Sequence, residues 1–170
     1  MKSLVVYYSR AFENYFGGTK KYIEVGNTEK LAKMIGEMVG ADLFKIEQER
    51  PYSKDYNTCI IEAKKDKEEN KRPKLISLPK SIDEYDKIYL GYPNYWGTIP
   101  MAVYSFLDSF DFKGKTIYPF CTHEGSSLSN TIKDIENNTN GAIVKDGFEI
   151  YGSKVDYAKE KLEKWILAEK

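Results

Sequence analysis

Short hydrophobic runs alternate with helical patterns along most of the chain. Five β-branched or aromatic runs predict strands at residues 4–8, 43–47, 87–91, 116–121 and 142–150. Between these runs, hydrophobic residues recur at the spacing of one face of an α-helix. Strands that alternate with helices predict a parallel sheet covered on both faces, because each connection must cross over before the next strand begins.

The helical stretches complete this pattern. One stripe is formed by Leu31, Ala32, Ile35, Met38 and Val39. Three others consist of Val103, Phe106, Leu107 and Phe110, after Pro100; of Leu128, Ile132 and Ile135; and of Ala158, Leu162, Trp165 and Ile166. A strongly charged helix with an apolar edge of Tyr56, Ile60 and Ala63 lies in a segment outside this minimal pattern. Right-handed crossovers leave few topologies for five strands. They favour a three-layer open α/β sandwich whose parallel sheet has the order 2-1-3-4-5.

Two segments exceed the minimal pattern. Residues 11–25 separate the first strand from its helix and contain Gly17-Gly18, a pair typical of a tight hairpin turn. Residues 48–80 include a strongly charged helix whose mixed signs indicate a solvated face. We find no repeat and no low-complexity linker, so we expect one domain over residues 1–170 that carries these two insertions.

Composition excludes several functional classes. The 26 Lys and Arg residues balance 26 Asp and Glu, and only three are arginines, which argues against a nucleic-acid partner. No apolar run approaches the ~20 residues needed to cross a bilayer, and the first ten residues lack a cleavage pattern. Two distant cysteines do not make a disulfide framework, so a reduced cytoplasmic protein is expected. A single histidine predicts neither a zinc site nor an acid–base triad.

In an open parallel sheet, ligands bind beyond the carboxyl ends of the strands, where the strand order reverses. The first loop at this edge begins with Ser9-Arg10 and resumes at Gly26-Asn27-Thr28, which open a helix. A helix N-terminus can bind an anion through its free N–H groups, although Asn27 or Thr28 equally suits a simple cap. No Walker lysine and no G-x-G-x-x-G is present, which disfavours a nucleoside triphosphate or a Rossmann dinucleotide.

The second loop, residues 91–98, places Tyr95 and Trp96 directly after a hydrophobic strand. Two large aromatic side chains in this turn suit stacking on a flat ring system, with Pro93 and Gly97 allowing backbone amides to approach its edge. The alternative is that both rings pack on a neighbouring helix or at an interface.

The third loop, residues 121–127, offers hydroxyls, N–H groups and a glycine. Cys121 with His123 could be a nucleophilic pair, but a cysteine still within a strand is more often an inert core thiol. His123 either contacts a ligand or lies on the surface of the loop.

Four motifs in this order resemble those of the flavodoxins, and most closely a bacterial branch of flavodoxin-like FMN proteins. They are YYSR at 7–10, GNTEKLA at 26–32, GYPNYWG at 91–97 and CTHEGS at 121–126. The resemblance covers essentially the whole chain. It implies the flavodoxin-like fold and FMN as the cofactor.

The resemblance also implies roles for individual residues. Ser9, Asn27 and Thr28 would hold the FMN phosphate, with Arg10 assisting. One wall of the isoalloxazine site would be formed by Pro93, Asn94, Tyr95, Trp96 and Gly97, with Tyr95 or Trp96 against the ring. The other side and the pyrimidine edge would be lined by Thr122, His123, Glu124, Gly125 and Ser126. Residues 11–25 interrupt the loop that the family keeps continuous, and our own hypothesis is that they fold as a hairpin lid beside the cofactor.

The function implied is that of a low-potential electron carrier that exchanges electrons with redox partner proteins and needs no catalytic side chain. Electron-carrier flavodoxins are typically acidic, whereas this chain is neutral. One alternative is therefore an NAD(P)H-dependent reductase of quinones or flavins. A less favoured alternative is a flavin-free binding domain. The phospho-acceptor version of that domain lacks the required acidic residues at 8–10 and 92–94.

Overall fold

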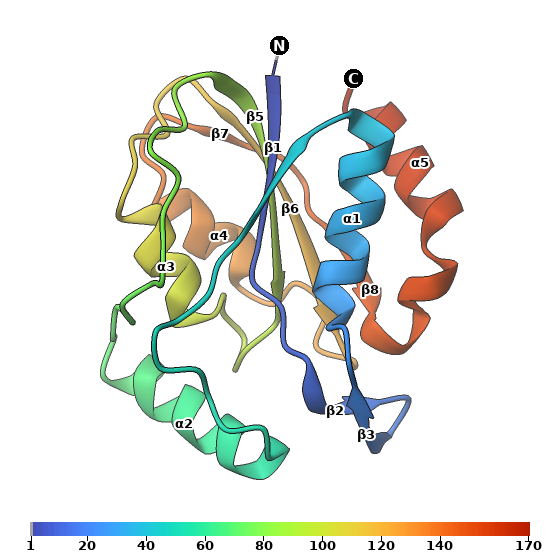
Figure 1. The fold of residues 1–170 in the computed structure, drawn as a ribbon. Coiled ribbons are helices and arrows are strands. Elements are labelled where there is room, and N and C mark those ends of the chain that lie inside the picture. The colour runs from blue at the N-terminus through green and yellow to red at the C-terminus, as the bar shows by residue number, and fades with distance from the viewer. Residues whose placement is uncertain (1) are drawn as a thin grey trace.

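The computed structural model describes residues 2–170 and contains a parallel sheet between two layers of helices (Figure 1). Every strand pair in this sheet is parallel. The strands follow the spatial order β4 (Asp42–Lys45), β1 (Lys2–Tyr7), β5 (Tyr85–Pro93), β6 (Thr116–His123) and, beyond β6, β7 (Ile143–Val144) with β8 (Phe148–Tyr151). The predicted order 2-1-3-4-5 is confirmed.

The last strand position differs from the prediction of one strand over 142–150. β7 pairs with Thr116 and Ile117, and β8 pairs with residues 120–123, so the ladder skips Tyr118 and Pro119. The carbonyl of Ile117 faces this side of β6, where it accepts from the amide of Lys145. Because strand residues alternate in direction, the nitrogen of Pro119 faces the same side and has no hydrogen to donate. The proline therefore interrupts the outer ladder.

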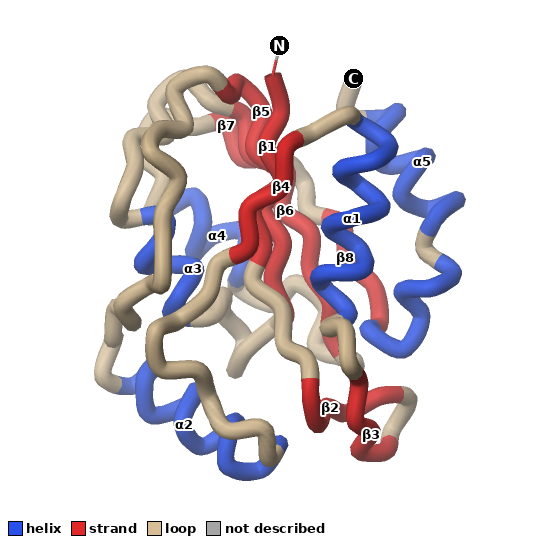
Figure 2. Tube along the Cα trace, in the orientation of Figure 1, coloured by secondary structure: helices blue, strands red, loops and turns tan. Residues whose placement is uncertain are grey.

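Alternation along β1 divides the core between the two faces of the sheet. Val5 and Tyr7 pack with α1 (Asn27–Val39) and α5 (Lys159–Ala168) on one face. Leu4 and Val6 pack with α3 (Met101–Leu107) and α4 (Thr131–Asn137) on the other. Figure 2 shows these two helical layers on opposite sides of the strands. The layers hold the carboxyl ends of β1, β5 and β6 in fixed positions at one edge.

Both insertions lie beyond this carboxyl edge. Residues 12–23 form the predicted hairpin, β2 (Phe12–Phe16) and β3 (Thr19–Ile23), as an antiparallel pair separate from the main sheet. Gly17 and Gly18 have φ of +66° and +89°, which matches the two positive φ values of the commonest two-residue hairpin turn. The charged helix is α2 (Tyr56–Glu68), and it lies near the hairpin at the lower end of the molecule in Figure 1.

The remaining predictions about composition concern metals and membranes. Among residues 2–170, no three His, Cys, Asp or Glu side chains are grouped so that they could hold a metal ion. No helix in the same range combines the length and the apolar character needed to cross a bilayer.

A short 3₁₀ helix, η1 (Gly152–Tyr157), follows β8 and completes the carboxyl edge.

Candidate functional site

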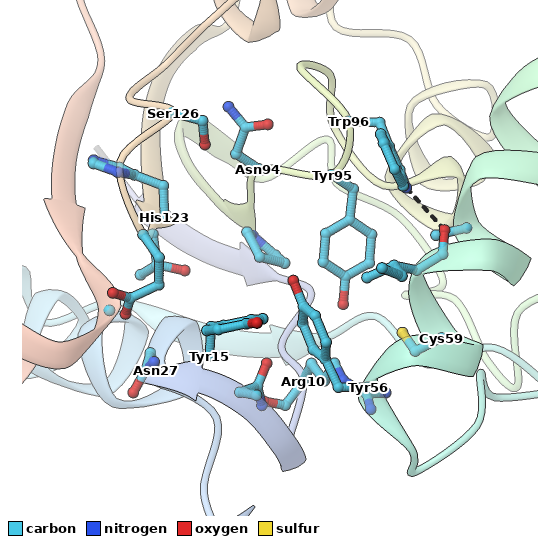
Figure 3. A pocket seen from close by; sticks show the side chains of 17 residues that line it. Arg10, Tyr15, Asn27, Tyr56, Cys59, Asn94, Tyr95, Trp96, His123 and Ser126 are labelled. Carbon is cyan, nitrogen blue, oxygen red and sulfur yellow. Dashed lines mark hydrogen bonds between the residues drawn. The ribbon is translucent and has the colours of Figure 1, made fainter. Parts of the chain in front are cut away.

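A cavity of about 370 Å³ lies at the carboxyl edge of the sheet (Figure 3). Ten of the fourteen residues predicted from the sequence line it: Arg10, Asn27, Pro93, Asn94, Tyr95, Trp96, Thr122, His123, Glu124 and Ser126. The structure thus brings the three predicted loops together around one space. The other four predicted residues, Ser9, Thr28, Gly97 and Gly125, do not line the cavity itself.

The first loop is closed in space although residues 11–25 interrupt it in the sequence. A Cβ atom on Gly26 would lie 2.1 Å from the Ser9 hydroxyl and 2.6 Å from the Arg10 carbonyl oxygen. Only glycine permits this approach. The hairpin therefore leaves the loop after Arg10 and returns to the same point.

The N-terminus of α1 presents unused backbone donors at this closed loop. The Ser9 hydroxyl accepts from the amide of Glu29 at 3.0 Å, so it caps the helix from a distant segment. Within residues 2–170, the amides of Asn27 and Thr28 donate to no protein acceptor. These first-turn amides and the positive end of the helix dipole favour an anion.

The hydroxyl of Thr28 has a buried partner within the protein. Thr28 is 2% exposed, and its hydroxyl lies 2.7 Å from the hydroxyl of Thr122 on β6. This buried bond joins the start of α1 to the end of β6. It fixes the helix N-terminus relative to the third loop.

Arg10 is held by backbone carbonyls. Its guanidinium donates to the carbonyls of Ser53 at 2.8 Å, Lys54 at 2.9 Å and Glu13 at 3.2 Å. These bonds tie the first loop to the hairpin and to the segment that precedes α2. Arg10 lines the cavity, but its hydrogen-bond donors are largely used for this structural connection.

The second loop is a tight turn held by Asn94. The side chain of Asn94 accepts from the amide of Gly97 and donates to Ser127 and Ser129 of the third loop. Trp96 has a φ of +56°, which is a genuine outlier for a bulky residue. Its indole N–H donates to the carbonyl of Ile60 at 2.9 Å. Trp96 therefore packs against α2, which was the alternative to ring stacking, while it still lines the cavity.

Tyr95 is the aromatic residue of this loop that points inward (Figure 3). Its ring lies edge-to-face with that of Tyr8, with centroids 5.8 Å apart. Its hydroxyl is buried and has no hydrogen-bond partner among the described residues. Burial raises the pKa of Tyr95 well above its usual value. A buried hydroxyl without a partner in a cavity wall indicates a place for a ligand or a water molecule.

The third loop uses its two ionisable side chains internally. His123 accepts from the amide of Gly125 through Nδ1, so its protonated Nε2 faces the carboxylate of Glu149. Glu124 accepts from the amide of Ser153 at 3.0 Å and from the amide of Gly17 in the hairpin turn at 3.3 Å. Both side chains are therefore engaged in hydrogen bonds within the protein.

The two cysteines are buried free thiols. Burial raises the pKa of Cys121, which packs in the core beneath the third loop, as expected for an inert thiol. Cys59 belongs to α2 and lines the cavity, and burial also raises its pKa.

Sequence reasoning missed the part of the cavity formed by the two insertions. The hairpin contributes Asn14 and Tyr15, α2 contributes Tyr56, Cys59, Ile60 and Ala63, and Gly152 lies after β8. The apolar edge assigned to the charged helix was the available signal, because it contains three of these residues. Nothing in the local pattern shows that this edge turns toward the ligand crevice and not toward the sheet.

Comparison with known proteins agrees with this architecture. The flavodoxin family model matches residues 19–169, which include the start of α1 and both later loops. A candidate flavoprotein from Bacteroides uniformis is 30% identical over 97% of each chain, with a TM-score of 0.76. A second, from Bacteroides eggerthii, is 25% identical over 95% of this chain and 98% of its own, with a TM-score of 0.72.

A Lactobacillus acidophilus flavoprotein solved in complex with FMN is 20% identical over 92% of this chain and 97% of its own, with a TM-score of 0.65. At that identity the likeness shows the fold alone. No curated protein matches the chain. The family match over most of the sequence, together with the sheet order and the three converging loops, leads to one conclusion: the chain belongs to the flavodoxin family.

Proposed function

We propose that the protein binds FMN in the cavity at the carboxyl edge and acts as an electron carrier between redox partner proteins. The observation that carries this proposal is the meeting of a helix N-terminus with unused amides and an aromatic cavity at one edge of the sheet. FMN combines a phosphate with a flat ring, and each part finds a suitable surface here. The neighbour solved with FMN supports the same cofactor.

The residues of the first loop fit a phosphate. The amides of Asn27 and Thr28 are unused, and the side chain of Asn27 lines the cavity. The tight contact of Gly26 with Ser9 and Arg10 places these donors in one loop. A phosphate can bind such a helix end without a dedicated lysine.

The residues of the second and third loops fit a planar ring. Pro93 and Tyr95 contribute apolar surface, and the buried hydroxyl of Tyr95 can donate a hydrogen bond that it does not make within the protein. Ser126 also lines the cavity. When bound, FMN would supply the redox chemistry, and the protein would supply orientation, exclusion of water and a shaped electrostatic environment.

The side chains around the cavity support transfer of electrons without protein acid–base catalysis. His123 and Glu124 are committed to internal hydrogen bonds. Burial raises the pKa of Tyr95 and of Cys59, so both remain protonated at neutral pH.

A carrier needs a site for one cofactor, whereas a reductase must also hold a second planar molecule over the flavin ring. Sites for a single small ligand span roughly 300 to 1,000 Å³, and this cavity of about 370 Å³ lies within that range. A site for one cofactor is what a carrier requires.

Anaerobic mixing of the FMN-loaded protein with NADH or NADPH tests this choice. We expect the flavin absorbance to persist with either nucleotide alone and to bleach when a flavodoxin reductase is added. Rapid bleaching by a nucleotide without any partner protein would contradict the carrier role and identify a reductase.

A further inference from the structure

We propose that Tyr15 of the hairpin and Tyr56 of α2 form an aromatic wall against the bound cofactor, so that the hairpin controls how fast FMN leaves. This inference rests on the proposed function. It adds a role for two residues that lie outside the flavodoxin-like motifs, one on the hairpin and one on α2.

The rings of the two tyrosines contact each other although they come from distant segments of the chain. Their ring centroids are 4.9 Å apart and the rings are nearly perpendicular, at 82°. Both rings line the same cavity as Asn27 and Tyr95 (Figure 3). Edge-to-face pairs of this kind are favourable and leave the remaining ring faces available for another contact.

The base of the hairpin is held against the start of α2 by polar contacts near this pair. The Glu13 carboxylate accepts from the amide of Tyr56 at 2.9 Å, which satisfies a free donor at the start of α2. Arg10 donates to the carbonyls of Ser53 and Lys54. The position of Tyr15 is thus fixed from the base of the hairpin.

The tip of the hairpin is attached separately. The Glu124 carboxylate accepts from the amide of Gly17 in the turn and from the amide of Ser153 after β8. The hairpin is therefore connected at its base to α2 and at its tip to the third loop. A segment attached at both ends across a ligand cavity can open only when one of these attachments breaks.

Tyr22 provides a matched control on the same hairpin. It is 62% exposed, packs against Phe12 and does not line the cavity, whereas Tyr15 is 41% exposed and does line it. Replacing either tyrosine by alanine removes a ring of the same size from the hairpin. Only the loss of Tyr15 removes surface from the cavity.

The test measures FMN release from the full-length protein by the fall in flavin fluorescence anisotropy after dilution. We expect Tyr15→Ala and Tyr56→Ala each to release FMN about tenfold faster than the wild type, as for the loss of one aromatic contact. Tyr15→Phe and Tyr22→Ala should retain the wild-type rate. Thermal unfolding of each variant shows that a faster release does not reflect a loss of fold.

A shortened chain that joins Arg10 directly to Gly26 extends the test. The two residues already lie together, so the junction needs little rearrangement. We expect this variant to release FMN at least as fast as Tyr15→Ala. Release rates of Tyr15→Ala and Tyr56→Ala that match Tyr22→Ala would overturn the inference while leaving the proposed function intact. Failure of the wild type to raise the anisotropy of FMN would instead overturn the proposed function.

Discussion

The cavity has two walls of different origin. The sheet-end wall, residues 93–97 and 122–126, follows directly from the carboxyl ends of β5 and β6. The inserted wall consists of Tyr15 from the hairpin with Tyr56, Cys59, Ile60 and Ala63 from α2. The first is positioned by the main sheet, whereas the second is positioned by contacts between two insertions.

This difference separates residues positioned by the sheet from residues positioned by contacts between the hairpin and α2. Within the sheet-end wall, Asn94 connects the second loop with the third, and the bond between Thr28 and Thr122 connects β6 with the start of α1. The inserted wall depends on Arg10, Glu13 and the indole of Trp96. Changes at the sheet-end wall should therefore affect the whole domain, and changes at the inserted wall should mainly affect the cavity.

We expect the largest effect on stability and on FMN binding for Gly26→Ala, at the point where Gly26 lies against Ser9 and Arg10. The new Cβ would lie 2.1 Å from the Ser9 hydroxyl and 2.6 Å from the Arg10 carbonyl oxygen, so backbone must shift. We expect a loss of about 1–3 kcal/mol in the free energy of unfolding, as for overpacking, together with loss of FMN binding. Urea unfolding and FMN titration measure both. An unchanged FMN affinity would show that the closed loop is not needed.

Thr28→Val tests the attachment of the sheet-end wall. It leaves the buried hydroxyl of Thr122 without its partner at 2.7 Å, which should cost about 1–3 kcal/mol of unfolding free energy. Because the Thr28 hydroxyl faces Thr122, the affinities for FMN and for riboflavin should fall by the same factor. A selective loss of FMN affinity would assign that hydroxyl to the phosphate.

A pair of substitutions at Trp96 tests the link between the walls. Both Trp96→Ala and Trp96→Gly lose the indole bond to Ile60, but only alanine remains strained at a φ of +56°. We expect Trp96→Gly to be more stable than Trp96→Ala by about 1 kcal/mol, the usual cost of a left-handed residue. Equal thermal stabilities of the two variants would indicate that the turn relaxes when the indole is removed.

We expect the smallest effect for the rate at which Cys59 in the inserted wall is alkylated. Burial raises the pKa of its thiol, so the reactive thiolate is scarce at neutral pH and alkylation by iodoacetamide should accelerate as the pH rises. Bound FMN should slow the reaction at Cys59, whereas Cys121 in the core should stay unmodified in both states. Mass spectrometry of the alkylated peptides distinguishes the two cysteines. Labelling of Cys59 that FMN leaves unchanged would place the cofactor away from α2.

Much of the fold could be predicted from the sequence, because the local hydrophobic patterns predict the strands and helices from which the sheet is built. The alternation of strands and helices predicted the strand order, and Gly17-Gly18 predicted the hairpin. The broken last strand was wrongly predicted as continuous. Its cause, the missing N–H of Pro119, lies on the neighbouring strand and not in residues 142–150.

The candidate site could also be predicted only in part. The sheet-end loops could be identified because parallel strands bring their carboxyl ends to one edge. The inserted wall could not, because the direction in which Tyr15 and Tyr56 point depends on long-range bonds such as that of Glu13 to the amide of Tyr56. The partners of the hydroxyl groups also depend on long-range contacts. Ser9 and Thr28 suit a phosphate by residue type, and in the fold the Ser9 oxygen accepts from the amide of Glu29 while the Thr28 hydroxyl bonds with that of Thr122.

Titration of the full-length protein with FMN, followed by flavin fluorescence anisotropy, shows whether the cavity binds this cofactor. We expect saturation at about one FMN per chain, as for one small-ligand cavity, and weaker binding of riboflavin, which lacks the phosphate for the α1 amides. An anisotropy that stays at the value of free FMN throughout the titration would rule out FMN as the ligand.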